Sequence, residues 1–149
     1  MAEAHGTLNP GFYLRSRPRG FVVHLLASGE NLRAVRELTG RALAEAGVDS
    51  ATAESAQLVV SELVGNSVRA CGPSVPLVVE VSVRRGAVVL GVHDPDPVGV
   101  PRRRGVAMDD AEAESGRGLA LVELLTSGWR VVRSPVGKQV RCRLEAVTC

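Results

Sequence analysis

The stretch Glu62-Leu63-Val64-Gly65-Asn66 places a carboxylate and a carboxamide four residues apart in an apolar segment. Residues at positions i and i+4 lie on one face of an α-helix. Glu62 and Asn66 therefore point in the same direction if the segment is helical, and buried polar groups need partners. The surrounding apolar residues are expected to be largely buried: Leu58, Val59, Leu63 and Val68. Taken alone, such a pair is more often two polar residues on a helix surface, so its meaning depends on the rest of the chain.

Two features further along the chain fit one kind of site. Asp94 follows a mostly apolar run, residues 87–93, which is expected to be a strand. Gly116-Arg117-Gly118-Leu119 begins a helical pattern, and glycines at a helix N-terminus let backbone N–H groups approach phosphate oxygens. Each feature has an ordinary alternative, because Asp94 before Pro95 can be a turn residue and the glycines can be a simple helix start. Together with Glu62 and Asn66, the three features follow the order of a nucleotide-binding site.

The hydrophobic periodicity predicts an α+β fold. Helical patterns cover residues 30–46, a segment that is capped by Asp49 or Ser50 and runs to about Ala70, and the segment from Ser115 or Gly116 to Leu125. Apolar or alternating runs predict strands at residues 20–27, 77–84, 87–94, 129–133 and 139–146. Because most of these strands follow one another in hairpins, we expect a two-layer α/β sandwich. Its sheet is expected to be mixed but mostly antiparallel, with the helices on one face.

The 149 residues are enough for one domain with its own core. Residues 1–19 show no periodicity and are expected to form a mobile tail, which leaves residues 20–149 as a single domain. Residues 95–114 begin with closely spaced prolines, which exclude a regular helix or strand. A loop of about 20 residues in a compact domain is usually functional or disordered. This one lies between the two candidate nucleotide motifs, where a lid is expected.

The composition argues against several classes of protein. A formal net charge of +2 is too small to indicate nucleic-acid binding, and no basic face with interleaved aromatic residues is present. The three cysteines lack metal-ligand spacing and are expected to be reduced thiols. No signal peptide or membrane span is predicted, so we expect a cytoplasmic protein without membrane contact. The only lysine, Lys138, lies in a predicted turn, which excludes a P-loop, and Leu121 stands where a Rossmann fingerprint has its third glycine.

Two stretches carry a family resemblance that extends from about Glu30 to the C-terminus. Val60–Arg69 resembles the N box of the GHKL ATPase superfamily, and Ser115–Val122 resembles its second glycine box. Within the superfamily, the chain is most similar to the stand-alone bacterial anti-sigma-factor serine/threonine kinases. The resemblance implies a Bergerat fold, ATP and Mg²⁺ as cofactors, and a homodimer. It also implies two protein partners: a sigma factor that is held inactive and a small anti-anti-sigma (STAS-domain) protein that is phosphorylated.

The same resemblance implies roles for individual residues. Asn66 is expected to ligate Mg²⁺, whose preferred ligands are oxygens, and Asp94 to accept a hydrogen bond from the adenine amine. Glu62 is expected to be the general base that accepts the proton of the attacking hydroxyl. Arg69 and four residues of the second glycine box are also expected to contact the nucleotide; the four are Gly116, Arg117, Gly118 and Leu119. Read alone, Arg69 is an exposed helix arginine.

The first glycine box departs from the family pattern. Glycines usually follow the aspartate two and four positions later, but here those positions hold Asp96 and Val98. Gly99 stands one residue further on and is taken as the nucleotide-binding glycine of this box. Gln139 stands where many relatives have threonine. These departures bear on ATP affinity more than on the fold.

Two functions remain open on these residues. One is an ATP-binding anti-sigma factor that phosphorylates a serine or threonine of an anti-anti-sigma protein and sequesters a sigma factor. The other is a nucleotide-dependent regulatory module that binds proteins without kinase activity. A two-component histidine kinase is a poor fit, because none of the three histidines lies in a helix upstream of the ATPase motifs: His5, His24 and His93. A DNA-binding repressor fits less well still, since no helix-turn-helix pattern is found.

Overall fold

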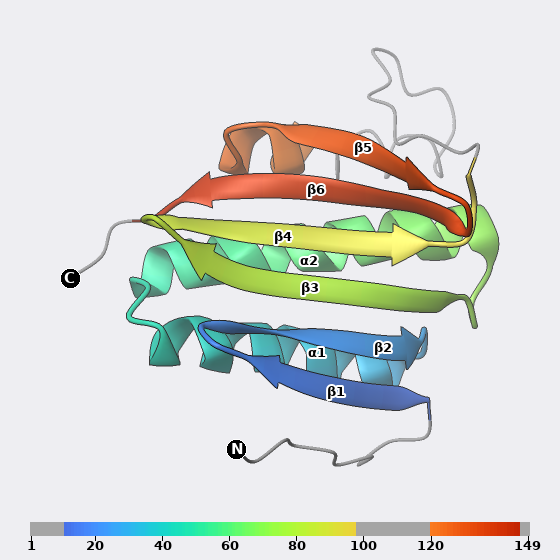
Figure 1. The fold of residues 1–149 in the computed structure, drawn as a ribbon, viewed down its shortest axis with the longest axis horizontal. Helices are drawn as coiled ribbons and strands as arrows, with labels where there is room; N and C mark the ends of the chain where they lie inside the picture. Colours follow the sequence, from blue (N-terminus) through green and yellow to red (C-terminus); the bar gives the residue numbers. More distant parts are fainter. Residues whose placement is uncertain (1–10, 98–119, 147–149) are drawn as a thin grey trace.

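The computed structural model describes residues 11–97 and 120–146 of the chain. Within these residues, one six-stranded sheet, in the order β1-β2-β3-β4-β6-β5, is covered by helices on one face only (Figure 1). The helices are α1 (Gly29–Glu45), α2 (Ser50–Cys71) and a helical segment at residues 120–125; the strands are β1 (Phe12–Arg17), β2 (Gly20–Leu26), β3 (Pro76–Arg84), β4 (Ala87–Asp94), β5 (Trp129–Ser134) and β6 (Gly137–Glu145). The predicted α+β class is confirmed. The five described strand pairs are all antiparallel, whereas a mixed sheet was expected.

The two long helices begin at side-chain caps. The hydroxyl of Ser28 accepts from the backbone N–H of Asn31 at 3.0 Å at the start of α1. At the start of α2, a carboxylate oxygen of Asp49 accepts from the backbone N–H of Thr52, also at 3.0 Å. Each bond satisfies one of the backbone donors that a helix start leaves unpaired. Of the two caps that the sequence allowed for α2, Asp49 and Ser50, the structure therefore has Asp49.

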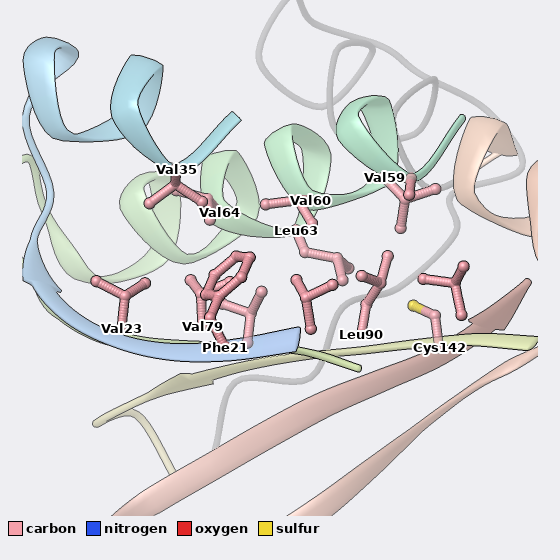
Figure 2. Close-up of a cluster of buried hydrophobic side chains, with 14 of the residues drawn as sticks. Phe21, Val23, Val35, Val59, Val60, Leu63, Val64, Val79, Leu90 and Cys142 are labelled. Atoms are coloured by element: carbon pink, nitrogen blue, oxygen red, sulfur yellow. The ribbon is translucent and has the colours of Figure 1, made fainter. Parts of the chain in front are cut away.

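The core lies between the sheet and the two helices and is built almost entirely from aliphatic side chains. Strand β3 alternates buried and partly exposed residues, as expected for a strand with one covered face. Figure 2 shows α2 side chains, with one from α1, lying over the inner face of the sheet; the labelled residues are Phe21, Val23, Val35, Val59, Val60, Leu63, Val64, Val79, Leu90 and Cys142. Because most of these side chains are small, α2 packs close to the backbone of the central strands.

The N-terminal prediction is wrong for part of its range. Residues 12–17 were expected to belong to a mobile tail, but they form β1, which pairs with β2 along its full length. Only Phe12 and Leu14 of this strand contribute to the core, so the sequence carries a weak strand signal. The hairpin turns at Arg19, which adopts a left-handed conformation with φ of 57°. Residues 1–10 lie outside the described part of the chain.

The predicted burial around Glu62 is correct for most residues and wrong for one. Val59 and Leu63 are buried and Val68 is partly buried, but Leu58 is 50% exposed. Successive residues of a helix are turned by about 100°, so Leu58 falls beside the buried stripe of α2 and not within it. None of the helices in residues 11–97 and 120–146 is long and apolar enough to cross a membrane.

The uncovered face of the sheet carries a row of side chains across four strands. Tyr13 pairs with His24, His24 with Val78, and Val78 with His93. Directly paired residues share a face of the sheet, and this row lines a pocket of about 510 Å³. None of the predicted site residues lines that pocket.

The two leucines of α2 give a matched test of the packing. Leu63→Ala is expected to lower the free energy of unfolding by about 2–5 kcal/mol, because it leaves a cavity under α2. Leu58→Ala makes the same chemical change at a half-exposed site and is expected to cost clearly less, about 1 kcal/mol or below. Urea unfolding followed by circular dichroism measures both values. Equal losses for the two variants would contradict the orientation of α2.

Candidate functional site

Asp94 is the last residue of β4 and is almost completely buried. One carboxylate oxygen, Oδ1, accepts from Lys138 Nζ at 2.8 Å and from the backbone N–H of Asp96 at 3.0 Å. The other oxygen, Oδ2, accepts from the hydroxyl of Ser67 at 2.6 Å. Asp94 therefore joins the end of β4 to the start of β6 and to α2.

Lys138 is the cationic partner of this carboxylate. Asp94 and Lys138 are directly paired residues of β4 and β6, and each side chain is only 3% exposed. Lys138 Nζ also donates to the backbone carbonyl of Asp96 at 3.1 Å. Gly137 makes the arrangement possible, because a Cβ at this position would collide with the backbone carbonyl of Asp94. Removing two charges from water is costly, and here both ions recover part of that loss through additional hydrogen bonds.

Lys138 and Ser67 were not predicted as site residues. Lys138 was expected in a turn, but the strand begins earlier and includes it. The signal was present in the alternation of β6, because counting back in twos from the buried Cys142 and Val140 reaches Lys138. Ser67 likewise falls four residues after Leu63, on the buried stripe of α2. In both cases the periodicity of the strand or helix indicates that the side chain is on the buried face, but it does not identify the residue that the side chain contacts.

Asn66 and Arg69 form a second polar contact on α2, next to the Asp94 group. Arg69 Nη2 donates to Asn66 Oδ1 at 2.6 Å. The amide nitrogen of Asn66, Nδ2, is buried and has no hydrogen-bond partner in the described part of the chain. A buried donor without a partner is destabilising by about 1–3 kcal/mol. A bound acceptor, such as a phosphate oxygen, would remove this penalty.

The structure brings part of the predicted site together. Glu62 is half-buried on α2, one helical turn before Asn66, as the i, i+4 spacing predicted. Ser67, the neighbour of Asn66, forms a hydrogen bond with Asp94. The candidate Mg²⁺ ligand, Asn66, and the candidate adenine-binding residue, Asp94, therefore belong to one group of residues. The remaining predicted residues lie outside the described part of the chain: Gly99, Gly116, Arg117, Gly118 and Leu119.

The described residues fit a magnesium ion only together with a nucleotide. No cluster of three or more His, Cys, Asp or Glu side chains that could hold a metal is found in residues 11–97 and 120–146. Asn66 Oδ1 offers one oxygen ligand, which suits Mg²⁺ because this ion is commonly held by one or two protein oxygens and by phosphates. Arg69 now occupies that oxygen, and its exposed side chain could turn to a phosphate instead.

One thiol lies close to the same group. Burial raises the pKa of Cys71, and the nearby carboxylates of Asp94 and Asp96 raise it further. Burial alone raises the pKa of Cys142, in the core, to about 12. A raised pKa lowers the fraction of thiolate, which is the nucleophilic form. Neither of these cysteines is therefore suited to nucleophilic catalysis at neutral pH.

Comparisons with known proteins agree with the fold. The model of the histidine kinase-like ATPase domain matches residues 25–144. The chain belongs to this family, a GHKL ATPase family, and membership implies that the domain binds ATP. No curated protein matches the chain well enough to count as a relative.

Two solved structures are similar to the chain to different degrees. The RsbU and RsbW domains of Rv1364c from Mycobacterium tuberculosis align with a TM-score of 0.59 and 21% identity, over 90% of this chain and 33% of that one. A histidine kinase domain from Erythrobacter litoralis EL346, of a blue-light activated histidine kinase, aligns with a TM-score of 0.42 and 23% identity. That alignment covers 63% of this chain and 44% of the other. The chain thus spans less than half the length of either structure.

The buried ion pair predicts a large effect on stability. Lys138→Met keeps the length of the side chain but leaves Asp94 without its cation, and it is expected to lower the free energy of unfolding by about 3–5 kcal/mol. Arg143→Ala is the matched control, because it breaks an exposed ion pair with Glu145 and is expected to change stability by no more than about 1 kcal/mol. Guanidinium unfolding of both variants measures the difference. A small loss for Lys138→Met would show that Asp94 does not depend on this cation.

Proposed function

We propose that the protein is an ATP-binding anti-sigma factor that phosphorylates a serine or threonine of an anti-anti-sigma protein and sequesters a sigma factor. The observation that carries the proposal is the position of Glu62 on α2, one turn before Asn66, in a domain of the histidine kinase-like ATPase family. A half-buried carboxylate beside the candidate metal ligand is suited to accept a proton during phosphoryl transfer. A domain that only binds ATP does not need this group.

The described residues support distinct roles toward the nucleotide. Asp94, whose carboxylate is oriented by hydrogen bonds from Ser67 and Lys138, would accept a hydrogen bond from the adenine amine. Asn66 would provide an oxygen to Mg²⁺, and the exposed guanidinium of Arg69 would pair with the triphosphate. When bound, the ion would neutralise charge that develops on the phosphates. The second glycine box would add backbone N–H donors to the phosphate oxygens.

The proposed transfer step needs one base. The hydroxyl oxygen of the substrate serine or threonine attacks the γ-phosphorus, and the bond between this phosphorus and the β,γ-bridging oxygen breaks. The hydroxyl proton passes to the carboxylate of Glu62, and ADP leaves with the bridging oxygen. Phosphoryl transfer of this kind depends mainly on positioning and electrostatic stabilisation, so the fixed placement of Glu62 and Asn66 on one helix is the relevant structural property.

The proposed partners rest on the resemblance of the N box and the second glycine box to the anti-sigma-factor kinases. They are a sigma factor, a STAS-domain anti-anti-sigma protein and a second copy of the chain. The likeness in fold to the RsbW domain of Rv1364c is consistent with this group.

A second candidate function is a nucleotide-dependent binding module without kinase activity. The first glycine box motivates it, because Asp96 and Val98 replace the usual glycines after Asp94. The nucleotide would then stabilise one conformation of a partner-binding surface. Transfer of phosphate to a partner protein separates the two functions.

Nucleotide binding is the first property to measure. Mg·ATP at about 100 times its dissociation constant adds roughly 2.7 kcal/mol to the free energy of unfolding, so the melting temperature of the wild type is expected to rise by several degrees. Asn66→Ala is expected to lose most of this rise, and Gln57→Ala, another carboxamide of α2, is expected to retain it. Differential scanning fluorimetry measures all three proteins. No rise in the wild type would contradict the proposed ATP site.

The role of Glu62 is tested by phosphoryl transfer. Glu62→Ala is expected to bind Mg·ATP like the wild type but to transfer phosphate at least about 100-fold more slowly, as expected for loss of a general base. Glu54→Ala removes an exposed carboxylate from the same helix and is expected to leave the rate unchanged. The assay follows ³²P from γ-labelled ATP to purified STAS-domain proteins of the same genome. If Glu62→Ala transfers phosphate at the wild-type rate, the assignment of the base is wrong.

A further inference from the structure

Among residues 11–97 and 120–146, the buried pair of Asp94 and Lys138 leaves one hydrogen-bonding position unused on each partner. An ammonium group has three N–H donors, and Lys138 uses two of them in the described part of the chain, on Asp94 Oδ1 and on the carbonyl of Asp96. A carboxylate has about four acceptor positions. Asp94 uses both positions of Oδ1 and one of Oδ2 within the same residues. Within the described residues, one donor and one acceptor are therefore left over on two groups whose nearest atoms, Lys138 Nζ and Asp94 Oδ1, are 2.8 Å apart.

This combination complements one edge of a purine ring. The six-membered ring of adenine has an amino donor at C6 and an acceptor, N1, directly beside it. We propose that Lys138 is a second base-reading residue, which donates to adenine N1 while the Asp94 carboxylate accepts from the C6 amine. The inference rests on the proposed ATP site and extends it, because a single carboxylate recognises only the amine.

Three features of the structure support this role for Lys138. The ammonium is fixed by the carboxylate of Asp94 and the carbonyl of Asp96, so no further side-chain freedom has to be lost on binding. It lies at a strand position set by the backbone pairing of β6 with β4. The pair is also shielded from water, and hydrogen bonds to charged groups are stronger there than at an exposed site.

Gln139 does not take part in the proposed recognition of the adenine edge that carries N1 and the C6 amine. Its side-chain amide donates to Glu80 Oε1 at 3.1 Å, and it passes Gly91, where a Cβ would meet the Gln139 side chain. Since neighbouring residues of a strand point to opposite faces, Gln139 and Lys138 cannot read the same ligand. Lys138 is therefore the residue of β6 that is placed to set base specificity.

Nucleotides that lack single ring nitrogens test the inference on the unmodified protein. Isothermal titration in the presence of Mg²⁺ would compare ATP, 1-deaza-ATP and 7-deaza-ATP. We expect 1-deaza-ATP to bind at least about tenfold more weakly than ATP, as for the loss of a hydrogen bond to a charged group. The matched control is 7-deaza-ATP, which keeps N1 and is expected to bind within about twofold of ATP.

Two variants test whether the preference for ATP over 1-deaza-ATP depends on the ammonium group of Lys138. Lys138→Met is expected to reduce the preference for ATP over 1-deaza-ATP to about twofold or less. Ser67→Ala removes another partner of Asp94 but keeps the ammonium, and it is expected to retain the preference. The wild-type comparison decides the question even if Lys138→Met does not fold.

The outcomes separate this inference from the proposed function. Equal binding of ATP and 1-deaza-ATP to the wild type overturns the role of Lys138 and leaves the ATP site standing. Tighter binding of GTP than of ATP also overturns it, because guanine presents an acceptor where adenine carries its amine and a donor at N1. Absence of binding by every nucleotide overturns both.

Discussion

The burial of Asp94 is the constraint on which the site depends. A carboxylate at the end of a central strand can remain buried only if a cation and several donors surround it. Lys138 of β6, Ser67 of α2 and the backbone of Asp96 meet this requirement. Helix α2 and strands β4 and β6, which carry Ser67, Asp94 and Lys138, also pack the core, so the polar group is held by the geometry of the fold. Gly137 lets the strands approach closely enough for the pair to form.

Helix α2 connects the core to the site because its two sides differ. One side carries small aliphatic residues against the sheet, and Ser67 continues this stripe to Asp94 (Figure 2). A serine hydroxyl is short, so the contact requires the helix to lie close to the end of β4. The scarcity of large aromatic residues in the core permits this close packing. Glu62, Asn66 and Arg69 lie outside this stripe, and their relative positions are fixed because the buried side of the same helix packs against the sheet.

Local periodicity was sufficient to predict most of the fold but only part of the site. The cap of α2 at Asp49 and the hairpin of β3 and β4 follow from patterns within a few residues, and both are confirmed. The placement of Glu62 one helical turn before Asn66 likewise follows from a local pattern, the i, i+4 spacing on a helix. The pairing of Asp94 with Lys138 spans 44 residues and depends on the register of two strands. The face of Lys138 could be read from the alternation of β6, whereas its partner requires the sheet order, which no local pattern contains.

Most of the polar groups proposed to recognise the nucleotide already have a partner in the chain itself. Lys138 contacts the carboxylate of Asp94, and Arg69 contacts the oxygen of Asn66. Binding at the Asn66 oxygen would exchange one contact for another, and such an exchange contributes much less free energy than a new hydrogen bond. Binding at Asp94 and Lys138 would instead use positions that are left over, so these two residues can add affinity without breaking their ion pair. On this proposal, specificity for the base and attraction for the phosphates would have separate physical origins, and a substitution would change one while leaving the other intact.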